Sequence, residues 1–564
     1  MIPCNDDHGM SRSLALPRDQ IVFVSLGGAG EIGMNMYLYG YDGKWLMVDC
    51  GITFADDSMP SVDIVLPDPT FIEEQGDDLV GLIITHGHED HLGAMTWLWP
   101  RLRCPVYATP FATALLNAKL AEFGQGTHDV PVVQTMTLGE PLNLGPFTVE
   151  AVSLTHSIPE PTALVLRTAA GTVLHSGDWK FDPAPLIGTT ADVATLARLG
   201  AEGIMALVGD STNVFTQGSS GSESDVRAGL MRLFANVEGS IAVACFASNV
   251  ARLESIALAA AAHDRRVALL GRSLWRIVAV ARQSGYLSGV SFYTDDDVAK
   301  LPRDRVLYVC TGSQGEPRSA LTRLAMLNHP FVRLGAGDMV VFSSRIIPGN
   351  ERAIYRLHNQ FVRLGARVVT ERDHPVHVSG HPGRAEMEEM FRLLRPRLLV
   401  PIHGEMRHLA EHAKLARACG SIAMVAENGQ VVSLGPDAPV LLGTVPVGRM
   451  AVDGGRLVPS DSPILRSRKR MMCNGAAAVT LVVDEGGHLL REPQVSVSGL
   501  LDPEQEGAEI TAAVTAVKMA VGRLSADERR KDESMCEAAR LAVRRRFRES
   551  FGKKPVTEVH LVRL

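Results

Sequence analysis

The stretch Thr85-His-Gly-His-Glu-Asp-His-Leu-Gly93 decides the fold class of this chain. It follows the apolar run Leu82-Ile83-Ile84, which predicts a buried strand. Four potential metal ligands fall within six residues of this stretch: His86, His88, Asp90 and His91. Burying so many imidazoles and carboxylates at one strand end is costly unless they bind a metal. The open alternative is a polar loop that is merely rich in histidine, so the choice depends on whether the chain supplies further ligands.

The composition indicates a globular protein of several domains. The chain has 564 residues, of which 46% are hydrophobic and 21% charged. It contains no apolar run long enough to span a bilayer and no signal-peptide pattern at its start, so we expect a cytoplasmic protein with no membrane partner. Its eight cysteines form no CxxC pair, which predicts reduced thiols and argues against a cysteine-type zinc site. The net charge of −7 means that a polyanionic substrate would need local positive charge.

Further candidate ligands follow other predicted strands. His156 ends the strand pattern of residues 147–154, and Asp178 follows a hairpin over residues 163–174. His403 ends the buried run of residues 397–402. Alone, His156 is more often a structural histidine, but loops at the carboxyl ends of strands can converge on one site.

A glycine pattern near the N-terminus, Gly28-x-Gly30-x-x-Gly33, matches the dinucleotide-binding fingerprint. That fingerprint requires a helix to follow, whereas the residues around Asp42-Gly43 predict a β-hairpin. We therefore do not expect a dinucleotide site. Asp49 then ends a strand, where it either supports a metal-binding histidine or is only a turn residue before Gly51.

Together these residues resemble the complete ligand series of the metallo-β-lactamase superfamily. The resemblance implies an α/β fold, an αββα sandwich that holds two zinc ions per subunit; histidine and carboxylate ligands also admit Mn²⁺. It implies one zinc held by His86, His88 and His156. It implies a second held by Asp90, His91 and His403, with Asp178 bridging the two and Asp49 supporting a ligand from behind.

The interval between the last two ligands predicts an inserted domain. Asp178 and His403 are separated by 225 residues (403 − 178), far more than a loop needs. Strand-like and Ala-rich helical runs alternate there, as in an α/β sheet. The insert resembles the β-CASP domain, and its motifs resemble those of the ribonuclease J family. The motifs concerned are Gly209–Asn213, Phe246–Asn249, Thr311–Pro317 and Ile347–Asn350.

The segment His377-Val378-Ser379-Gly380-His381 predicts a phosphate-binding loop, because glycines and Pro382 disfavour a helix. Hydroxyl, imidazole and backbone N–H donors suit a phosphate. The alternative is a glycine-rich turn between domains. By the resemblance, this segment binds RNA together with Ser248 and Asn249. The resemblance also implies that His381 donates a proton, that Asp210 orients groups at the domain junction and that Asp90 takes part in catalysis.

The expected domain order follows from these assignments, with a small α+β domain at the C-terminus. We expect an N-terminal arm over 1–19, a metallo-β-lactamase domain over 20–208 and 371–445, an inserted β-CASP domain over 209–370, a linker over 446–463 and a C-terminal domain over 464–564. The resemblance assigns oligomerisation, as a homodimer or homotetramer, to the C-terminal domain. Basic runs at 466–470 and 544–554 either contact RNA or are solvated helix faces.

The resemblance implies a ribonuclease that uses a hydroxide activated by two metals. It further implies 5′-to-3′ exonuclease activity on RNA with a 5′-monophosphate, endonuclease activity, and a role in RNA maturation and decay. Two alternatives remain at this point. A hydrolase of small esters, lactones or thioesters would use the same ligands without the insert, and a non-catalytic RNA-binding protein would be expected to lose ligands.

Overall fold

A computed structural model describes residues 16–56, 58–123 and 130–564, so most of the expected N-terminal arm lies outside the described residues. The chain divides into two compact units. The first comprises Met1–Thr53 and Leu66–Gly448, and the second comprises Phe54–Val65 and Arg449–Leu564. Within the described ranges, no helix is both long and apolar enough to cross a membrane.

Two sheets form the centre of the first unit. An eight-stranded sheet has the order β24-β23-β1-β3-β4-β7-β8-β9, and a seven-stranded sheet has the order β10-β11-β12-β13-β14-β20-β22. The bounds in the first sheet are β1 Ile21–Gly27, β3 Met36–Tyr41, β4 Lys44–Val48, β7 Leu79–Ile84, β8 Val106–Ala108, β9 Val133–Thr135, β23 Gln430–Gly435 and β24 Val440–Thr444. Those in the second are β10 Leu142–Leu144, β11 Phe147–Ser153, β12 Thr162–Thr168, β13 Gly171–His175, β14 Ala206–Asp210, β20 Leu398–Ile402 and β22 Ile422–Ala423.

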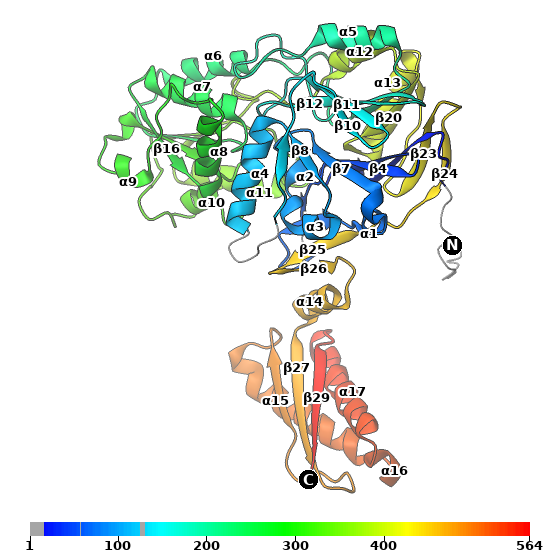
Figure 1. Ribbon diagram of the computed structural model, residues 1–564. Helices are drawn as coiled ribbons and strands as arrows, with labels where there is room; N and C mark the ends of the chain where they lie inside the picture. The colour runs from blue at the N-terminus through cyan, green and yellow to red at the C-terminus, as the bar shows by residue number, and fades with distance from the viewer. Residues whose placement is uncertain (1–15, 57, 124–129) are drawn as a thin grey trace. The chain divides into compact units, whose positions relative to one another are not determined.

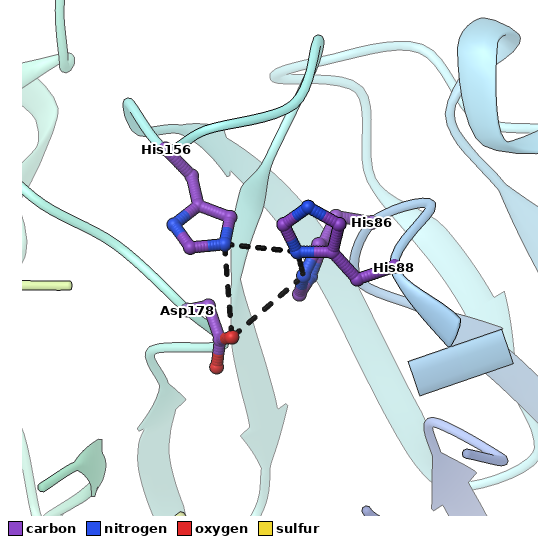
Figure 2. A group of neighbouring side chains, drawn as sticks. All are labelled: His86, His88, His156 and Asp178. Atoms are coloured by element: carbon purple, nitrogen blue, oxygen red, sulfur yellow. Dashed lines mark hydrogen bonds and ion pairs between the residues drawn. The ribbon is translucent and has the colours of Figure 1, made fainter. Parts of the chain in front are cut away.

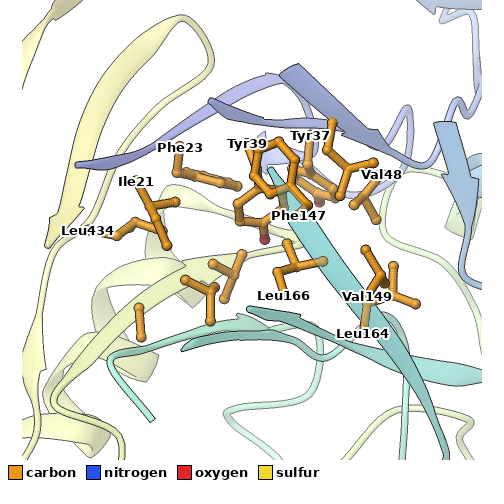
Figure 3. Packing of buried hydrophobic residues seen from close by; sticks show 14 of the residues in the cluster. Ile21, Phe23, Tyr37, Tyr39, Val48, Phe147, Val149, Leu164, Leu166 and Leu434 are labelled. Carbon is orange, nitrogen blue, oxygen red and sulfur yellow. The ribbon is translucent and has the colours of Figure 1, made fainter. Parts of the chain in front are cut away.

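The two sheets face each other across one apolar core. Alternate residues of β12 point to opposite sides, so Leu164 and Leu166 enter this core while Val165 faces the helices behind the sheet. Phe23 and Tyr39 of the first sheet meet them from the other side (Figure 3). Burial of both inner faces accounts for the apolar runs in these strands.

Helices cover the outer faces of both sheets, as expected for an αββα sandwich. Figure 1 shows α5, α12 and α13 beyond the seven-stranded sheet, and α3 and α4 beside β7 and β8 of the other. Their bounds are α3 Met95–Leu102, α4 Pro110–Phe123, α5 Val193–Glu202, α12 Arg384–Leu394 and α13 Met406–Ala418. The predicted fold class is confirmed.

A third, fully parallel sheet lies between β14 and β20 in the chain, with the order β16-β17-β15-β18-β19. Its strands are β15 Ile241–Ala244, β16 Arg266–Leu270, β17 Val306–Cys310, β18 Met339–Phe342 and β19 Arg367–Val369. Its helices are α6 Glu223–Phe234, α7 Val250–Ala261, α8 Arg272–Gln283, α9 Asp295–Val298, α10 Ala320–Ala325 and α11 Glu351–Arg363. This is the α/β insert that the long interval predicts.

The glycine pattern at residues 28–33 leads into a hairpin rather than a helix. Tyr41 pairs with Lys44 across a two-residue turn, and both turn residues, Asp42 and Gly43, have positive φ angles of 48° and 74°. The short strand β2 Ala29–Gly30 pairs with β21 Gly404–Glu405, directly after His403. The glycine-containing segment therefore pairs with the backbone next to His403, one of the predicted metal ligands, instead of binding a dinucleotide.

The stretch expected as a linker, 446–463, contains a hairpin instead. β25 Arg449–Asp453 pairs with β26 Arg456–Pro459, and they belong to a sheet of order β26-β25-β6-β5, with β5 Thr53–Phe54 and β6 Ile64–Pro67. Gly454-Gly455 is the hairpin turn, and the strands around it are too short for sequence alternation to reveal them.

The rest of the second unit is a small α+β fold. Its sheet has the order β28-β27-β29, with β27 Ala476–Val483, β28 Gln494–Ser498 and β29 Val556–Arg563. Helices α15 Pro503–Gly522 and α17 Asp532–Phe551 pack on this sheet, and α14 Pro463–Asn474 precedes it. Buried residues of α17 recur every four positions, Met535, Ala539, Val543 and Phe547, which accounts for the packed face of that helix.

Candidate metal centre and RNA site

The opening histidine motif lies where β7 ends and the short helix α2 Glu89–Leu92 begins. Asp49, fully buried at the end of the neighbouring strand β4, accepts hydrogen bonds from the backbone N–H of Thr85 (2.8 Å) and from its hydroxyl (3.0 Å). Asp49 and His403 have positive φ angles of 63° and 53°. Such strain in residues other than glycine is typical of functional sites.

Four side chains form the first group of potential ligands (Figure 2). The Nε2 atoms of His86 and His156 lie 3.1 Å and 3.0 Å from Nδ1 of His88. Asp178 Oδ2 lies 3.8 Å from His86 Nε2 and 3.7 Å from His156 Nε2. Three imidazole nitrogens and one carboxylate oxygen thus face a common point, as in a tetrahedral zinc site.

A second group shares Asp178 with the first and adds Asp90, His91 and His403. His403 Nε2 lies 3.1 Å from Asp90 Oδ2, and His91 Nε2 lies 3.2 Å from Asp178 Oδ2. The seven predicted ligands therefore come together in two adjoining groups, although 317 positions of the chain separate His86 from His403 (403 − 86). The common Asp178 could bridge two ions.

In four of the candidate ligand histidines, the ring nitrogen that points away from the ligand group, Nδ1, has a hydrogen-bond partner of its own. His91 Nδ1 donates to Asp49 at 2.7 Å, and His86 Nδ1 lies 3.0 Å from the Thr85 hydroxyl. Two similar contacts come from other segments: His156 Nδ1 donates to the Gly380 carbonyl (2.6 Å), and His403 Nδ1 lies 2.6 Å from the Thr212 hydroxyl. Such bonds fix ring orientation and direct the other nitrogen of each ring toward the ligand groups, so this donor set fits zinc.

The charges at the site also favour a cation. Burial lowers the pKa of His86 and His156 well below the usual value and that of His88 to about 4, which leaves these imidazoles neutral and able to bind metal. Burial acts on His403 in the same direction, but nearby carboxylates, first that of Asp178, outweigh it and raise its pKa to about 9. The carboxylates therefore concentrate negative charge on one side of the site.

His381 lies beside both groups. Its Nδ1 donates to Asp210 Oδ2 at 2.8 Å, and its ring stacks against that of His403 with centroids 5.4 Å apart. Burial alone would lower the pKa of His381, but the carboxylates of Asp210 and Asp178 raise it. Asp178, Asp210, His381 and His403 also form a third possible ligand group, but a His381 that carries a proton on Nδ1 for Asp210 is suited to proton transfer.

The predicted phosphate loop is irregular and is attached to the metal groups. Ser379 Oγ accepts hydrogen bonds from Asn213 Nδ2 (2.7 Å) and from the backbone N–H of His381 (3.2 Å). At Gly380 a Cβ atom would lie only 2.6 Å from the His156 ring, so the close approach requires glycine. Val378 packs against Gly221.

A buried ion pair supports this loop from behind. Arg252 donates to Glu223 at 2.8 Å and 3.0 Å, to the carbonyl of Val376 at 3.1 Å and to Nδ1 of His377 at 3.4 Å. Asn249 belongs to the same network: its amide donates to Glu223 (3.0 Å), and its oxygen caps α7 at the backbone N–H of Arg252 (2.9 Å). These internal bonds involve both the amide nitrogen and the oxygen of Asn249, the residue that the resemblance assigns to substrate binding.

Ser248 and Asn249 therefore differ in what they offer a ligand. Ser248 is only partly buried, whereas Asn249 is 5% exposed. The roles of Ser248 and Asn249 in RNA binding both stay predictions.

Several contacts at the site involve residues that sequence reasoning missed. Thr212 and Asn213 follow Asp210 in the motif Gly209–Asn213, in which only the acid has a predicted role. Asn35 Nδ2 donates to the backbone carbonyl of Asp90 at 3.0 Å and lies 3.0 Å from His91 Nε2. A run of polar residues after a motif acid, here Ser211 to Asn213, is a usable signal for Thr212, but a lone Asn35 in a strand pattern carries none.

Comparison with known proteins agrees with this geometry. Four family models match: Metallo-beta-lactamase superfamily over residues 29–204, Ribonuclease J, beta-CASP domain over 238–361, Zn-dependent metallo-hydrolase RNA specificity domain over 365–428 and Ribonuclease J C-terminal domain over 463–564. A Ribonuclease J of Sinorhizobium meliloti is 42% identical over 97% of this chain and 98% of its own length. The chain belongs to the ribonuclease J family.

Other relatives extend the same likeness. A Ribonuclease J of Mycobacterium tuberculosis strain H37Rv is 40% identical over 84% of this chain and 86% of its own length. A solved structure, a protein of unknown function from Enterococcus faecalis V583, aligns with a TM-score of 0.50 at 16% identity. It covers 73% of this chain and 100% of that one, which supports the fold alone.

Proposed function

We propose that this protein is a metal-dependent ribonuclease that hydrolyses RNA phosphodiester bonds. The observation that carries the proposal is the bond from His156 Nδ1 to the Gly380 carbonyl, because it joins a potential metal ligand to the predicted phosphate loop. Membership of the ribonuclease J family and the match to a Zn-dependent RNA specificity domain support RNA as the substrate.

Seven residues would hold the metals: His86, His88 and His156 on one side, Asp90, His91 and His403 on the other, and Asp178 between them. Two zinc ions, when bound, supply a water acidic enough to ionise near neutral pH and positive charge against phosphate oxygens. Mn²⁺ suits the same donors. Asp49 and Thr212 hold the rings of His91 and His403 in place from behind.

The chain's own groups would orient RNA and complete the proton transfer. Ser379 and the backbone of 377–381 would bind a phosphate, with His377 and Val378 forming one wall of the loop. His381 would deliver a proton to the departing 3′-oxygen through Nε2, since Asp210 holds its Nδ1. Asp90 would contribute to catalysis by its place in the second ligand group.

The finer properties follow from the resemblance and are part of the proposal. We expect 5′-to-3′ exonuclease activity favouring 5′-monophosphate RNA, together with endonuclease activity. We also expect a cytoplasmic enzyme that forms a dimer or tetramer through residues 464–564.

The test is an assay of the purified protein on several substrates. Single-stranded RNA with a 5′-monophosphate should be cleaved faster than RNA with a 5′-triphosphate. Simple esters, lactones and thioesters should be turned over slowly or not at all, because an ester hydrolase needs neither the inserted domain nor the loop. Efficient ester hydrolysis without RNA cleavage would contradict the proposal.

A further inference from the structure

Three cations lie close enough to His377 to lower its pKa together with burial: Arg252, Arg345 and Lys180. Two of them are internal. Arg252 and Lys180 are each 1% exposed, and they pair with Glu223 and Asp182 at 2.8 Å and 3.2 Å. Their charges are therefore already compensated, and neither side chain can reach a ligand in solution.

Arg345 differs from both. It is exposed, and in the described part of the chain its guanidinium is bonded to the neutral amide oxygen of Asn213, at 2.7 Å from Nη1, rather than to a carboxylate. The two remaining nitrogens of the planar guanidinium, Nε and Nη2, can donate together to one phosphate. Arg345 is thus a cation available to an anionic ligand.

The position of this guanidinium is fixed by two connections. The backbone carbonyl of Arg345 accepts a hydrogen bond from Gln314 Nε2 at 2.8 Å. The buried Asn213, which accepts from Arg345, donates through Nδ2 to Ser379 Oγ (2.7 Å) and to the His381 carbonyl (3.0 Å). Only one amide separates the guanidinium from the loop that the proposed function assigns to phosphate.

We propose that Arg345 binds a phosphate of RNA next to the His377–His381 loop, and that Asn213 is the positioning residue that aims the guanidinium at it. This inference rests on the proposed ribonuclease function. The phosphate is either the 5′-terminal group or an internal phosphate of the same strand. Both have the same chemistry, and the experiment below distinguishes them.

The experiment compares Arg345→Gln with Arg363→Gln, a matched control that removes an exposed arginine from the end of α11. Steady-state cleavage is measured on the same RNA with a 5′-monophosphate or a 5′-hydroxyl end. For Arg345→Gln we expect KM to rise about 10-fold, as for loss of one charge-assisted contact, with little change in kcat. The slope of log KM against log salt should fall by about 0.7, the value for one phosphate contact on a single strand.

Conservative variants separate charge from geometry. Arg345→Lys keeps the charge but loses the planar fork, so its KM should lie between those of the parent and Arg345→Gln. Asn213→Ala should raise KM in the parent background and raise it by a smaller factor in the Arg345→Gln background. The part that is lost is the support of the guanidinium, and the part that remains is the support of Ser379 and the His381 carbonyl. A KM increase confined to 5′-monophosphate RNA assigns the terminal phosphate, and an equal increase on both RNAs assigns an internal one.

Two results would overturn the inference: a KM for Arg345→Gln equal to that of Arg363→Gln, or a fall in kcat at unchanged KM. Equilibrium binding of a hydrolysis-resistant phosphorothioate RNA gives a readout that is independent of turnover. If the parent fails to cleave RNA but Arg345→Gln still binds the phosphorothioate about 10-fold more weakly, the proposed catalytic function fails and the phosphate contact stands.

Discussion

At the scale of single residues, the hydrogen-bond partner of Nδ1 fixes the direction in which each imidazole presents its other nitrogen. His91 and His403 face the metal groups because Asp49 and Thr212 hold their Nδ1 atoms. His381 has the same kind of support from Asp210, but it lies outside the two principal ligand groups. Under the proposed function, the same side-chain type would serve as a ligand or as a proton donor according to its position and its partner.

This difference predicts the behaviour of His381→Ala. Because His381 is assigned to proton transfer rather than metal binding, kcat on RNA should fall about 10²- to 10⁴-fold while zinc content stays at the parent value. Cleavage kinetics and elemental analysis of the same preparation check this. Asp210→Asn should give a smaller loss of kcat, since the ring remains present but loses its charged partner. Loss of zinc from His381→Ala would mean that the residue is a ligand.

The residues that carry chemical signals were predictable, and so were two acids that orient them, Asp49 and Asp210; the neutral residues that orient them were not. His86 to His91, His156, Asp178 and His403 stand out because imidazole and carboxylate are rarely placed together at strand ends without a reason. Asn213 and Arg345 are ordinary polar residues, and only the fold brings Asn213 to Ser379 and Arg345 to Asn213. Asn249, which the resemblance assigns to substrate binding, also caps a helix, and that second role could not be read from the motif; its role in binding stays a prediction.

At the scale of elements, the loop between β19 and α12 connects the insert to the metal centre. On one side, Ser343 Oγ, just after β18, donates to the Val376 carbonyl at 2.7 Å. On the other side, Gly380 lies against His156. The position of the phosphate loop therefore depends on the inserted parallel sheet, through Ser343, and on the seven-stranded sheet, through His156.

The close approach at Gly380 predicts a large effect of a single methyl group. A Cβ atom would meet the His156 ring at 2.6 Å and Ser157 Oγ at 2.8 Å, so Gly380→Ala must displace the loop or the ligand. We expect kcat/KM on RNA to fall at least about 100-fold, since a shift of about 1 Å at a reacting centre has that cost. Gly289→Ala is the control, because nothing lies within 4 Å of its added Cβ. Full activity of Gly380→Ala would contradict a role of this contact in aligning the loop.

The support behind the loop predicts a stability effect. Arg252→Met leaves the buried Glu223 without its partner, so the free energy of unfolding should fall by about 3–5 kcal/mol. The matched control is Arg227→Met, whose pair with Glu254 is about one-quarter exposed and should be worth about 1 kcal/mol or less. Urea titrations followed by circular dichroism compare the two. Equal losses would show that the Arg252 pair is no more important than a surface pair.

Secondary structure was predictable where hydrophobic runs were long. The hairpin at Asp42-Gly43 was expected, because two residues with positive φ suit that dipeptide. The hairpin β25–β26 was expected as a linker, because short strands around Gly454-Gly455 resemble a loop in sequence. Local sequence patterns could not show that the segment Phe54–Val65 belongs to the same compact unit as the distant residues Arg449–Leu564.

At the scale of the whole molecule, every residue of the candidate site belongs to the first unit, Met1–Thr53 with Leu66–Gly448. The second unit supplies its own core of twelve buried residues on β27, β28, α15 and α17. Catalysis and assembly should therefore be separable.

Removal of residues 464–564 tests this separation. The shortened protein keeps β25 and β26 and all seven proposed ligands. It should retain its zinc, while its mass in analytical ultracentrifugation falls from a dimer or tetramer to a single chain. A shortened protein of unchanged oligomeric state would place the interface elsewhere.

The most direct test of the proposed two-metal site is metal-dependent RNA cleavage by the purified protein. We expect cleavage of 5′-monophosphate RNA, loss of cleavage on chelation, and recovery when zinc or manganese is restored to two ions per chain. His403→Ala and Asp90→Ala should bind less than two ions and cleave at least about 100-fold more slowly. Full RNA cleavage by the chelated protein, or by either variant, would contradict a metal-dependent mechanism at these residues.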